Sequence, residues 1–531
     1  YIQNLITIFF CLKVVIRFKQ FKKSTPEDLS YVAAVVEYEF SWDVANNVQN
    51  YLTLIRDAAE KDADVVVFPE LCLNPGQDHY VPIPINGLLK HDPIPAIRAD
   101  LYHEILVAIS AGARENAIYV VVNIQEIMNC EDAAGEECPE KKTYIFNTNI
   151  VFDRQGAVVS RYRKMNLFGE YTRTPALRPD LGEFSTDFGV RFGHFICFDL
   201  MFQVPAVQTP QKLNVTDIIY TGMWVSELPY LTAVQIQEAY AYSMNVNFIA
   251  AGANNVTEGG AGSGIYSGKA GALISIMPGL PTTRLLVTRV PKVPGQVQSY
   301  PGPIYNDPSD HDNLLINGDP SMAAHTSRLL VPGYQSFTLT SGDIICSFNI
   351  NLTQTEKTLY KYRAGVLSGV RTYDGKATGG IKVCAVFACT GDDIDSCSKR
   401  FPKYTAESLA TFEELSIAAN LTAPKRNEDL QADNIVYYPI SLQPSILPLE
   451  AKDYSLNINQ IGDRTFYNYK LLNGNVELYS FGIFGRMFER DDEAPQVLCL
   501  FLLCPRQAVY FSSKAFLAKL LFYWSECSLH T

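Results

Sequence analysis

Apolar residues in the first 290 positions alternate between short continuous runs and helical spacing. The run at 31–38 (YVAAVVEY) is rich in β-branched side chains and is typical of a buried strand. A helix is predicted next, because apolar residues then recur every three or four positions: Val44, Val48, Leu52, Ile55 and Ala59. A second short run, 64–68 (DVVVF), predicts another buried strand that ends at Pro69 and Glu70.

The same alternation continues to about residue 290. Two further helices are predicted, one from Leu101 to near Gly112 and one over 228–244. Further strands are predicted at 118–124, 146–152, 158–162, 190–195, 217–220 and 246–251. Strands that alternate with helices and hairpins indicate a layered α/β domain over residues 31–290.

The pattern changes after residue 290. Proline, glycine, serine and aspartate are frequent over 291–336, which we interpret as a linker or a wrapping segment. Strands then dominate residues 337–491 and predict a second, β-rich domain. Its clearest strand signals lie at 337–340, 381–387, 434–439 and 476–484.

The two ends of the chain fit neither domain. Residues 1–30 contain an apolar stretch followed by basic residues, the reverse order of a secretory signal, so they are interpreted as an N-terminal extension or an imperfect signal. Residues 492–531 form a tail of unassigned role with two short apolar runs broken by lysines. A lipid-anchor signal is one alternative for this tail, although it lacks a clear small-residue site and polar spacer.

Composition narrows the class of protein. The hydrophobic share of 47% and the charged share of 19% exclude a disordered chain. The net charge of −12 argues against a nucleic-acid partner, because such binding rests on basic surfaces. No apolar run reaches the roughly 18 residues of a membrane-spanning helix, which excludes a polytopic membrane protein. The oligomeric state is left open.

Twelve cysteines in 531 residues are too few for a disulfide scaffold but enough for several cross-links and one reactive thiol. Short spacings between cysteines favour disulfides, and no histidine lies at zinc-ligand spacing beside them. Zinc binding or free thiols are the alternatives, and spacing alone does not fix connectivity. The pairs we expect are Cys130–Cys138, Cys346–Cys384 and Cys389–Cys397.

Four N-x-S/T sequons accompany these cysteines. Candidate glycosylation sites are Asn214, Asn255, Asn351 and Asn420. Sequons also arise by chance, so they add little alone. Together with the cysteine spacing, they predict an extracellular protein, secreted or anchored at the cell surface.

Three motifs place chemistry-bearing residues at or just after predicted strands. They are Glu70 in VVVFPE, Lys164 in YRKMNLFGE and Cys197 in FGHFICFD. Such positions line the crevices in which α/β folds place their sites. Each has a simpler explanation when taken singly: a turn carboxylate, a surface lysine and a small core cysteine.

Together the three side chains make a coherent catalytic set. A thiol with a pKa near 8.5 is mostly protonated at neutral pH and needs a base to become a nucleophile. A carboxylate can take that proton and later deliver it to a leaving amine, while an ammonium stabilises the negative charge of the intermediate. His194 precedes Cys197 by three residues and would project from the opposite strand face, so we predict no Cys–His dyad.

This constellation resembles the Glu–Lys–Cys triad of the nitrilase, or carbon–nitrogen hydrolase, superfamily. The resemblance is closest to its vanin/biotinidase branch and covers about residues 31–491. The matching segments are FPE (68–70), YRKMNLFGE (162–170), FGHFICFDLMF (192–202), TGMWVSELPYLTA (221–233), GSGIY (262–266) and FGRMFERD (484–491). The resemblance implies a nitrilase-type α-β-β-α sandwich followed by a smaller β-rich C-terminal domain.

The resemblance also implies roles for individual residues. Glu70 would be the general base and acid, Lys164 the electrostatic partner and Cys197 the nucleophile that forms a thioester. The backbone N–H of Phe198 would join Lys164 in stabilising the oxyanion, and Glu170 would position water. Trp224 lies in a segment that marks the branch. No metal or organic cofactor is required.

The implied activity is hydrolysis of a linear secondary amide, a small-molecule substrate. Pantetheine, which would give pantothenate and cysteamine, is favoured over biotinyl amides such as biocytin. The segment 252–261 departs from the pattern of the branch on the substrate side, which leaves the substrate choice open. A non-catalytic secreted binding protein on the same scaffold and an intracellular amidase are the rival hypotheses.

Overall fold

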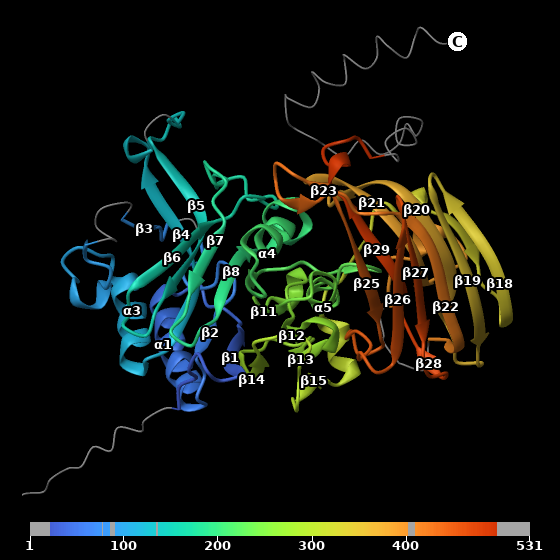
Figure 1. Cartoon of the computed structure of the whole chain (residues 1–531), viewed down its shortest axis with the longest axis horizontal. Helices are drawn as coiled ribbons and strands as arrows, with labels where there is room; N and C mark the ends of the chain where they lie inside the picture. The colour runs from blue at the N-terminus through green and yellow to red at the C-terminus, as the bar shows by residue number, and fades with distance from the viewer. Residues whose placement is uncertain (1–21, 77, 85–90, 134–135, 402–408, 496–531) are drawn as a thin grey trace, which may run out of the picture.

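The computed structural model describes residues 22–76, 78–84, 91–133, 136–401 and 409–495. It consists of a layered α/β unit and an all-β unit packed side by side (Figure 1). The lipid-anchor hypothesis concerns residues that lie mostly outside these ranges, as does most of the proposed N-terminal extension.

The first layers are two helices and a mixed sheet. Within the described residues the sheet has seven strands: β14 (Arg284–Pro291), β1 (Ser30–Glu37), β2 (Val65–Val67), β4 (Tyr119–Asn129), β5 (Thr143–Phe152) and β6 (Val158–Arg163) in spatial order, with β3 (Val81–Pro82) paired to β4. Helices α1 (Val44–Glu60) and α3 (Glu104–Asn116) cover its outer face. Tyr51, Ile55 and Ile109 of these helices are fully buried against the sheet.

A second sheet stacks on the inner face of the first. Its described strands, in spatial order, are β15 (Gly302–Ile304), β13 (Ala272–Ile276), β12 (Ser263–Ser267), β11 (Asn247–Gly252), β9 (Asp217–Gly222), β8 (Arg191–Ile196) and β7 (Gly182–Ser185). Helices α4 (Gln208–Leu213) and α5 (Ala233–Met244) cover the face of this second sheet that points away from the first sheet. Val35, Val67, Ile219 and Ile249 meet between the sheets, and the predicted α-β-β-α sandwich is confirmed.

Two predicted helices have different bounds in the structure. The helix predicted from residue 228 begins only at Ala233, because Pro229 lacks a backbone donor and the Gln235 side chain accepts from the Thr232 N–H to cap the helix start. The helix predicted to end near Gly112 continues to Asn116. A Cβ on Gly112 would lie 2.8 Å from Leu52 Cδ2, so the glycine lets α1 and α3 pack closely.

The C-terminal unit is a pair of antiparallel sheets. One has the order β17 (Thr326–Leu329), β20 (Lys361–Tyr373), β21 (Ala377–Cys389), β29 (Ser480–Met487) and β25 (Ile435–Leu442). The other has the order β18 (Gly333–Ser341), β19 (Ile344–Thr353), β22 (Thr411–Thr422), β27 (Arg464–Leu471) and β26 (Tyr454–Ile461), with β28 (Val476–Glu477) beside β22. This β-rich unit follows the sandwich, as predicted.

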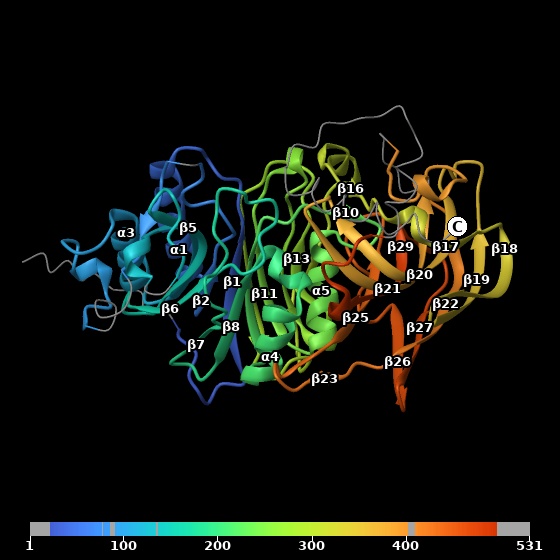
Figure 2. The same cartoon turned by 90° about the horizontal axis from the view of Figure 1, so that it is seen from above.

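The two units are joined through α5 and the segment after β14. Ser243 Oγ on α5 donates to Tyr437 O at 2.8 Å, and Gln235 Nε2 donates to Ser480 Oγ at 3.1 Å. The connecting segment contributes strands to both units: β15 pairs with β13, β17 pairs with β20, and β16 (Asn317–Gly318) pairs with β10 (Glu227–Leu228). A further strand pair, β23 (Arg426–Asn427) with β24 (Ala432–Asp433), lies beside α4 (Figure 2).

Short helical turns connect many of these elements. Two follow β8 directly, a 3₁₀ turn at Cys197–Met201 and a π-type turn at Gln203–Val207. The others in the described chain are the 3₁₀ turns Pro95–Ile97, Cys130–Asp132, Val256–Glu258, Gly268–Ala270, Pro308–Asn313, Met322–Ala324, Ile394–Ser396 and Phe488–Arg490.

Three disulfides join the cysteine pairs expected from the sequence, Cys130–Cys138, Cys346–Cys384 and Cys389–Cys397. The second links β19 of one C-terminal sheet to β21 of the other. The two remaining cysteines of the described chain, Cys72 and Cys197, are free and buried.

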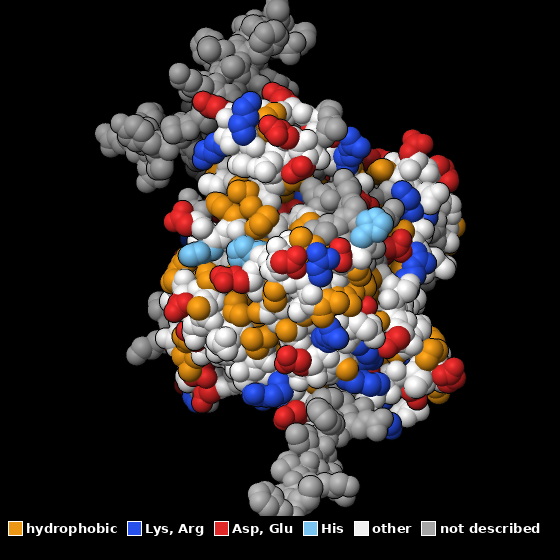
Figure 3. Space-filling model, turned by 90° about the vertical axis from the view of Figure 1, so that its left-hand side faces the viewer, with side chains coloured by type: hydrophobic (Ala, Val, Ile, Leu, Met, Phe, Trp, Pro, Cys, Tyr) orange, Lys and Arg blue, Asp and Glu red, His pale blue; other side chains and the backbone are white. Residues whose placement is uncertain are grey.

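The face formed by α1 and α3 carries interspersed basic and acidic side chains with apolar groups among them (Figure 3). Basic residues do not gather into a patch on this face, in keeping with the acidic composition. Among the helices of the described chain, none has the length and apolar content needed to cross a membrane.

Candidate active site

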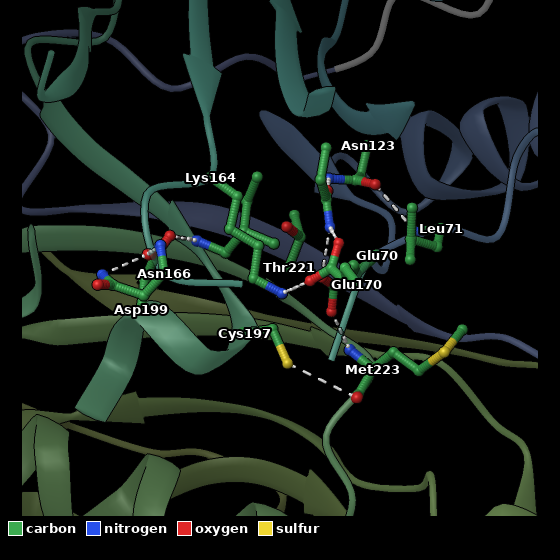
Figure 4. A network of polar contacts seen from close by, with 12 residues as sticks. Glu70, Leu71, Asn123, Lys164, Asn166, Glu170, Cys197, Asp199, Thr221 and Met223 are labelled. Atoms are coloured by element: carbon green, nitrogen blue, oxygen red, sulfur yellow. Dashed lines mark hydrogen bonds and ion pairs between the residues drawn. The ribbon is translucent and has the colours of Figure 1, made fainter. Parts of the chain in front are cut away.

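The three residues singled out from the sequence follow strand ends that meet at one edge of the two stacked sheets (Figure 4). Glu70 comes after β2, Lys164 directly after β6, and Cys197 directly after β8. The side chains that follow these three strands lie in the same interior region, and all three residues are buried.

The Glu70 carboxylate is held from three directions. Its Oε1 accepts from Lys164 Nζ at 2.7 Å and from Asn147 Nδ2 at 2.7 Å. Its Oε2 accepts from the backbone N–H of Met223 at 2.8 Å. These bonds fix the orientation of the carboxylate, which is 2% exposed.

Glu170 joins the same network. Its carboxylate accepts from Lys164 Nζ and, at 2.9 Å, from Asn147 Nδ2, so both carboxylates share the same two donors. Burial lowers the pKa of Lys164, but the negative charges of Glu170 and Glu70 outweigh it and hold that pKa well above its ordinary value. Lys164 is therefore a permanent cation between two carboxylates, and its charge lowers the pKa of Glu170 against the effect of burial.

Cys197 sits in a strained turn beside this network. Its φ of 47° lies in the left-handed region, which non-glycine residues rarely adopt, and such strain gathers at functional sites. The thiol donates to Met223 O at 3.6 Å. Burial, followed by the charge of Glu70, raises the pKa of the thiol, so the sulfur is protonated at rest and requires a base.

Asp199, which the sequence analysis did not single out, stabilises the strained turn through hydrogen bonds. Its carboxylate accepts from Tyr162 Oη at 2.7 Å and from the Asn166 N–H at 2.9 Å. It also accepts from the N–H of Ile196, the residue before the nucleophile candidate, at 3.2 Å. Burial raises the pKa of Asp199 to about 6. The neighbouring motif YRKMN therefore supplies two groups that hold this turn.

Asn147 is a second residue that the sequence analysis missed. It bridges Glu70 and Glu170, and its Oδ1 accepts from Asn123 Nδ2 at 2.7 Å. The available signal was the pair of asparagines at 147 and 149 within a largely apolar strand, since a buried amide needs partners.

A cavity of about 40 Å³ opens beside Cys197. Its walls are mostly apolar and comprise Phe168, Cys197, Phe198, Met223, Trp224, Val225, Glu227, Leu231 and Tyr373. Trp224, expected as a supporting residue, lies in this wall with its Nε1 donating to Leu231 O at 2.9 Å. Phe198, expected as a backbone donor, lies in the first turn of the 3₁₀ helix, where N–H groups lack intrahelical partners.

The hydrogen bond that His194 makes in the described structure does not involve the Cys197 thiol. His194 Nε2 is hydrogen-bonded to Ser160 Oγ at 2.8 Å, and burial lowers the pKa of His194 to about 3. Among the described residues, no group of three or more His, Cys, Asp or Glu side chains converges as a metal site.

The four sequon asparagines differ in exposure. Asn214 is exposed in the left-handed residue that ends α4. The other three, Asn255, Asn351 and Asn420, are partly buried. Asn420 lies near the end of the paired strand β22, and its Oδ1 accepts from Arg464 Nε at 2.7 Å. Asn255 Oδ1 accepts from Thr257 Oγ1 at 3.0 Å. Glycosylation at each remains a prediction.

Comparison with known proteins identifies the family. The family model described as carbon-nitrogen hydrolase matches residues 32–288, and the one described as vanin C-terminal domain matches residues 316–491. Vanin-like protein 2 of Drosophila melanogaster is 36% identical over 488 residues, which cover 87% of this chain and 90% of that protein. The chain belongs to the vanin-like carbon–nitrogen hydrolases.

Two human proteins are also similar to the chain. Human biotinidase is 29% identical over 401 residues, covering 68% of this chain and 72% of that protein. Human pantetheinase is 28% identical over 402 residues, covering 70% and 75% respectively. The resemblance stated from the sequence motifs is thus confirmed, and the cluster around Cys197 lies in the hydrolase part of a vanin-like enzyme.

Proposed function

We propose that this carbon–nitrogen hydrolase cleaves a linear secondary amide through a thioester on Cys197, with pantetheine as the substrate. One observation carries the mechanism: the backbone of a single residue, Met223, binds both reacting groups. Its N–H donates to Glu70 Oε2 and its carbonyl accepts from the Cys197 thiol. The base and the nucleophile are thereby held against the same residue.

In the first half-reaction the proton of the Cys197 thiol passes to Glu70 as sulfur attacks the amide carbonyl. Lys164 and the Phe198 N–H stabilise the negative charge on the carbonyl oxygen. The tetrahedral intermediate then collapses, the C–N bond breaks, and the departing nitrogen takes the proton from Glu70. The amine leaves and a thioester remains.

Water completes the cycle. Glu70 takes a proton from the attacking water, and Glu170 positions that water through the network that both carboxylates share with Lys164 and Asn147. The C–S bond breaks, sulfur recovers the proton from Glu70, and the carboxylic acid leaves. Every proton that moves is returned, so the enzyme ends in its starting state.

Biotinyl amides such as biocytin are the alternative substrates, because human biotinidase matches this chain about as well as human pantetheinase does. We further propose an extracellular location, either secreted or at the cell surface. The three disulfides support it, since such cross-links persist in oxidising compartments.

The test is a chromatographic assay of the purified protein with pantetheine and with biocytin, beside a Cys197→Ala control. Release of cysteamine that disappears in the control supports the proposal. Release of biotin alone moves the substrate to the alternative. If neither substrate turns over while Cys197 is still alkylated by iodoacetamide, the substrate proposal is wrong.

A further inference from the structure

The C-terminal domain reaches into the cavity beside Cys197. Tyr373, the last residue of β20, is the member of the cavity wall that this domain supplies. Its ring packs edge-on against Phe198 with centroids 5.3 Å apart. Three residues later, Lys376 Nζ lies 5.1 Å from the ring centroid of Phe168, so the hairpin tip between β20 and β21 packs on the wall at two points.

The Tyr373 hydroxyl has no hydrogen-bond partner among the described residues, although the residue is only 4% exposed. A buried hydroxyl without a partner costs about 1–3 kcal/mol, so such groups are rare in folded proteins. Tyr51, Tyr220 and Tyr438 also have hydroxyls without a partner in the described structure, but of these four tyrosines only Tyr373 lies in the cavity wall. A ligand in the cavity would supply the partner that the Tyr373 hydroxyl lacks.

Neighbouring polar groups of the cavity wall are already engaged. Trp224 Nε1 donates to Leu231 O, and the Glu227 carboxylate pairs with Arg371. The Arg371 guanidinium lies 4.5 Å from the centroid of the Tyr373 ring and also pairs with Asp319. Burial raises the pKa of Tyr373, which keeps the phenol protonated and able to donate.

The cavity places Tyr373 and Cys197 in one wall. An acyl chain bonded to Cys197 therefore presents to Tyr373 the atoms that follow closely after the scissile carbonyl.

We propose that the Tyr373 hydroxyl is a specificity-determining donor that binds a hydrogen-bond acceptor near the scissile carbonyl in the acyl part of the substrate. This inference rests on the proposed amide hydrolysis and names the acyl class that the site selects. The pantothenoyl group carries an amide carbonyl after a short spacer and fits this requirement. The biotinyl group places a longer unbroken methylene chain there and leaves the hydroxyl unpaired. A site built to bond a polar group rejects analogues that lack it.

The test compares Tyr373→Phe with a matched control, Tyr438→Phe. Tyr438 lies in the same domain on β25, is fully buried, and likewise has a hydroxyl without a hydrogen-bond partner in the described structure, but it is not part of the cavity wall. Each variant is assayed for release of cysteamine from pantetheine and from N-hexanoylcysteamine, which has the same leaving amine and no acceptor in its acyl chain. The rate of Cys197 alkylation by iodoacetamide reports the integrity of the turn.

We expect Tyr373→Phe to lower kcat/KM for pantetheine roughly tenfold, chiefly through KM. Turnover of N-hexanoylcysteamine and the alkylation rate should stay within about twofold, as should all three values in Tyr438→Phe. Unchanged pantetheine turnover in Tyr373→Phe, or an equal loss on both substrates with slowed alkylation, overturns the inference and leaves the hydrolase mechanism standing. A wild-type protein inactive on pantetheine overturns the substrate proposal and this inference together.

Discussion

Lys164 in the hydrolase domain and Lys382 in the C-terminal domain are both buried lysines that pair with carboxylates, but their partners differ. The Lys164 side chain is 1% exposed, and its partners Glu70 and Glu170 are 2% and 9% exposed. The Lys382 side chain is 3% exposed, whereas its partner Asp343 is 46% exposed. The Lys164 cluster is shielded from water, whereas the Lys382 pair is in contact with it. The shielded cluster is the environment that the proposed chemistry requires, and the Lys382 pair fits a role in anchoring.

Cysteines show a related difference. The hydrolase domain contains one disulfide, Cys130–Cys138, and keeps Cys197 as a free buried thiol in a strained turn. The described cysteines of the C-terminal domain are all paired, and Cys346 and Cys384 link its two sheets. The second domain thus uses its described cysteines for cohesion and contributes one side chain to the wall of the cavity beside Cys197.

The largest effect should follow from Cys197→Ala. We expect turnover of the amide substrate to fall at least 10⁴-fold, because no other group can form the thioester. The temperature of thermal unfolding should change little, since the substitution removes one sulfur and breaks no ion pair. Amine release and a melting curve measure the two quantities. Residual activity within tenfold of wild type would contradict the assigned nucleophile.

Lys164→Met should be the most destabilising single change. It leaves Glu70 and Glu170 buried without their cation, which costs about 3–5 kcal/mol. Lys382→Met is the matched control and should cost about 1 kcal/mol, because water can solvate Asp343. Denaturant unfolding compares the two variants. Equal losses in both would show that burial of the partner carboxylates does not decide the cost.

Replacing both Cys346 and Cys384 by alanine should lower the free energy of unfolding by about 2–4 kcal/mol and leave kcat/KM near that of wild type. The disulfide spans 38 positions, whereas Cys130–Cys138 spans 8, so removing the latter pair should cost about 1 kcal/mol less. Unfolding and activity measured on both double variants check this. A loss of activity larger than the loss of stability would contradict the cohesive role.

The smallest expected effect concerns pH. Partial burial raises the pKa of Asp343, but hydrogen bonds from Lys382 and Thr422 outweigh this effect. The pKa of Asp343 is thereby lowered to about 2, below its unfolded value near 3.8. A depressed carboxyl pKa stabilises the fold above the unfolded pKa, and this contribution is lost as pH falls through the folded pKa. After discounting for exposure we expect about 1 kcal/mol.

Comparing Asp343→Asn with wild type isolates this contribution from other titrating carboxylates. Wild type should be the more stable protein at pH 5, and the difference should shrink between pH 4 and pH 2. Urea unfolding at each pH gives the values. If the stability difference between wild type and Asp343→Asn stays constant over this pH range, the Lys382–Asp343 pair does not contribute to the acid response.

Local sequence signals were sufficient for the layered fold and for the neighbourhood of Glu70, Lys164 and Cys197. Glu70 and Cys197 follow buried strands, Lys164 follows the more polar strand β6, and strand ends meet at one edge of a sheet. The catalytic roles themselves stay predictions until the variants are assayed. The fold class is confirmed, because alternating apolar runs report directly on which faces are buried.

Other parts of the site depend on contacts that local patterns do not encode. Tyr373 reaches the cavity from a strand far along the chain, and Met223 acts through its backbone, which no side-chain motif reveals. The bridging role of Asn147 depends on the pairing of β4 with β5, which brings it beside Asn123 and which the sequence alone does not show. The late start of α5 depends on capping by Gln235, a detail of two residues within an otherwise helical pattern.

The connecting strands β16 and β17 also constrain how substrate reaches the thiol. β16 is bound to β10 next to Glu227 of the cavity wall, with Asn317 N donating to Ser226 O at 2.9 Å, while β17 is paired along β20. A segment bound to both domains resists their separation. We therefore expect entry to the cavity to depend on rotation of wall side chains, which takes picoseconds to nanoseconds, rather than on domain opening over microseconds to milliseconds. The turnover rate should then be set by bond making at Cys197 and not by the opening of a gate.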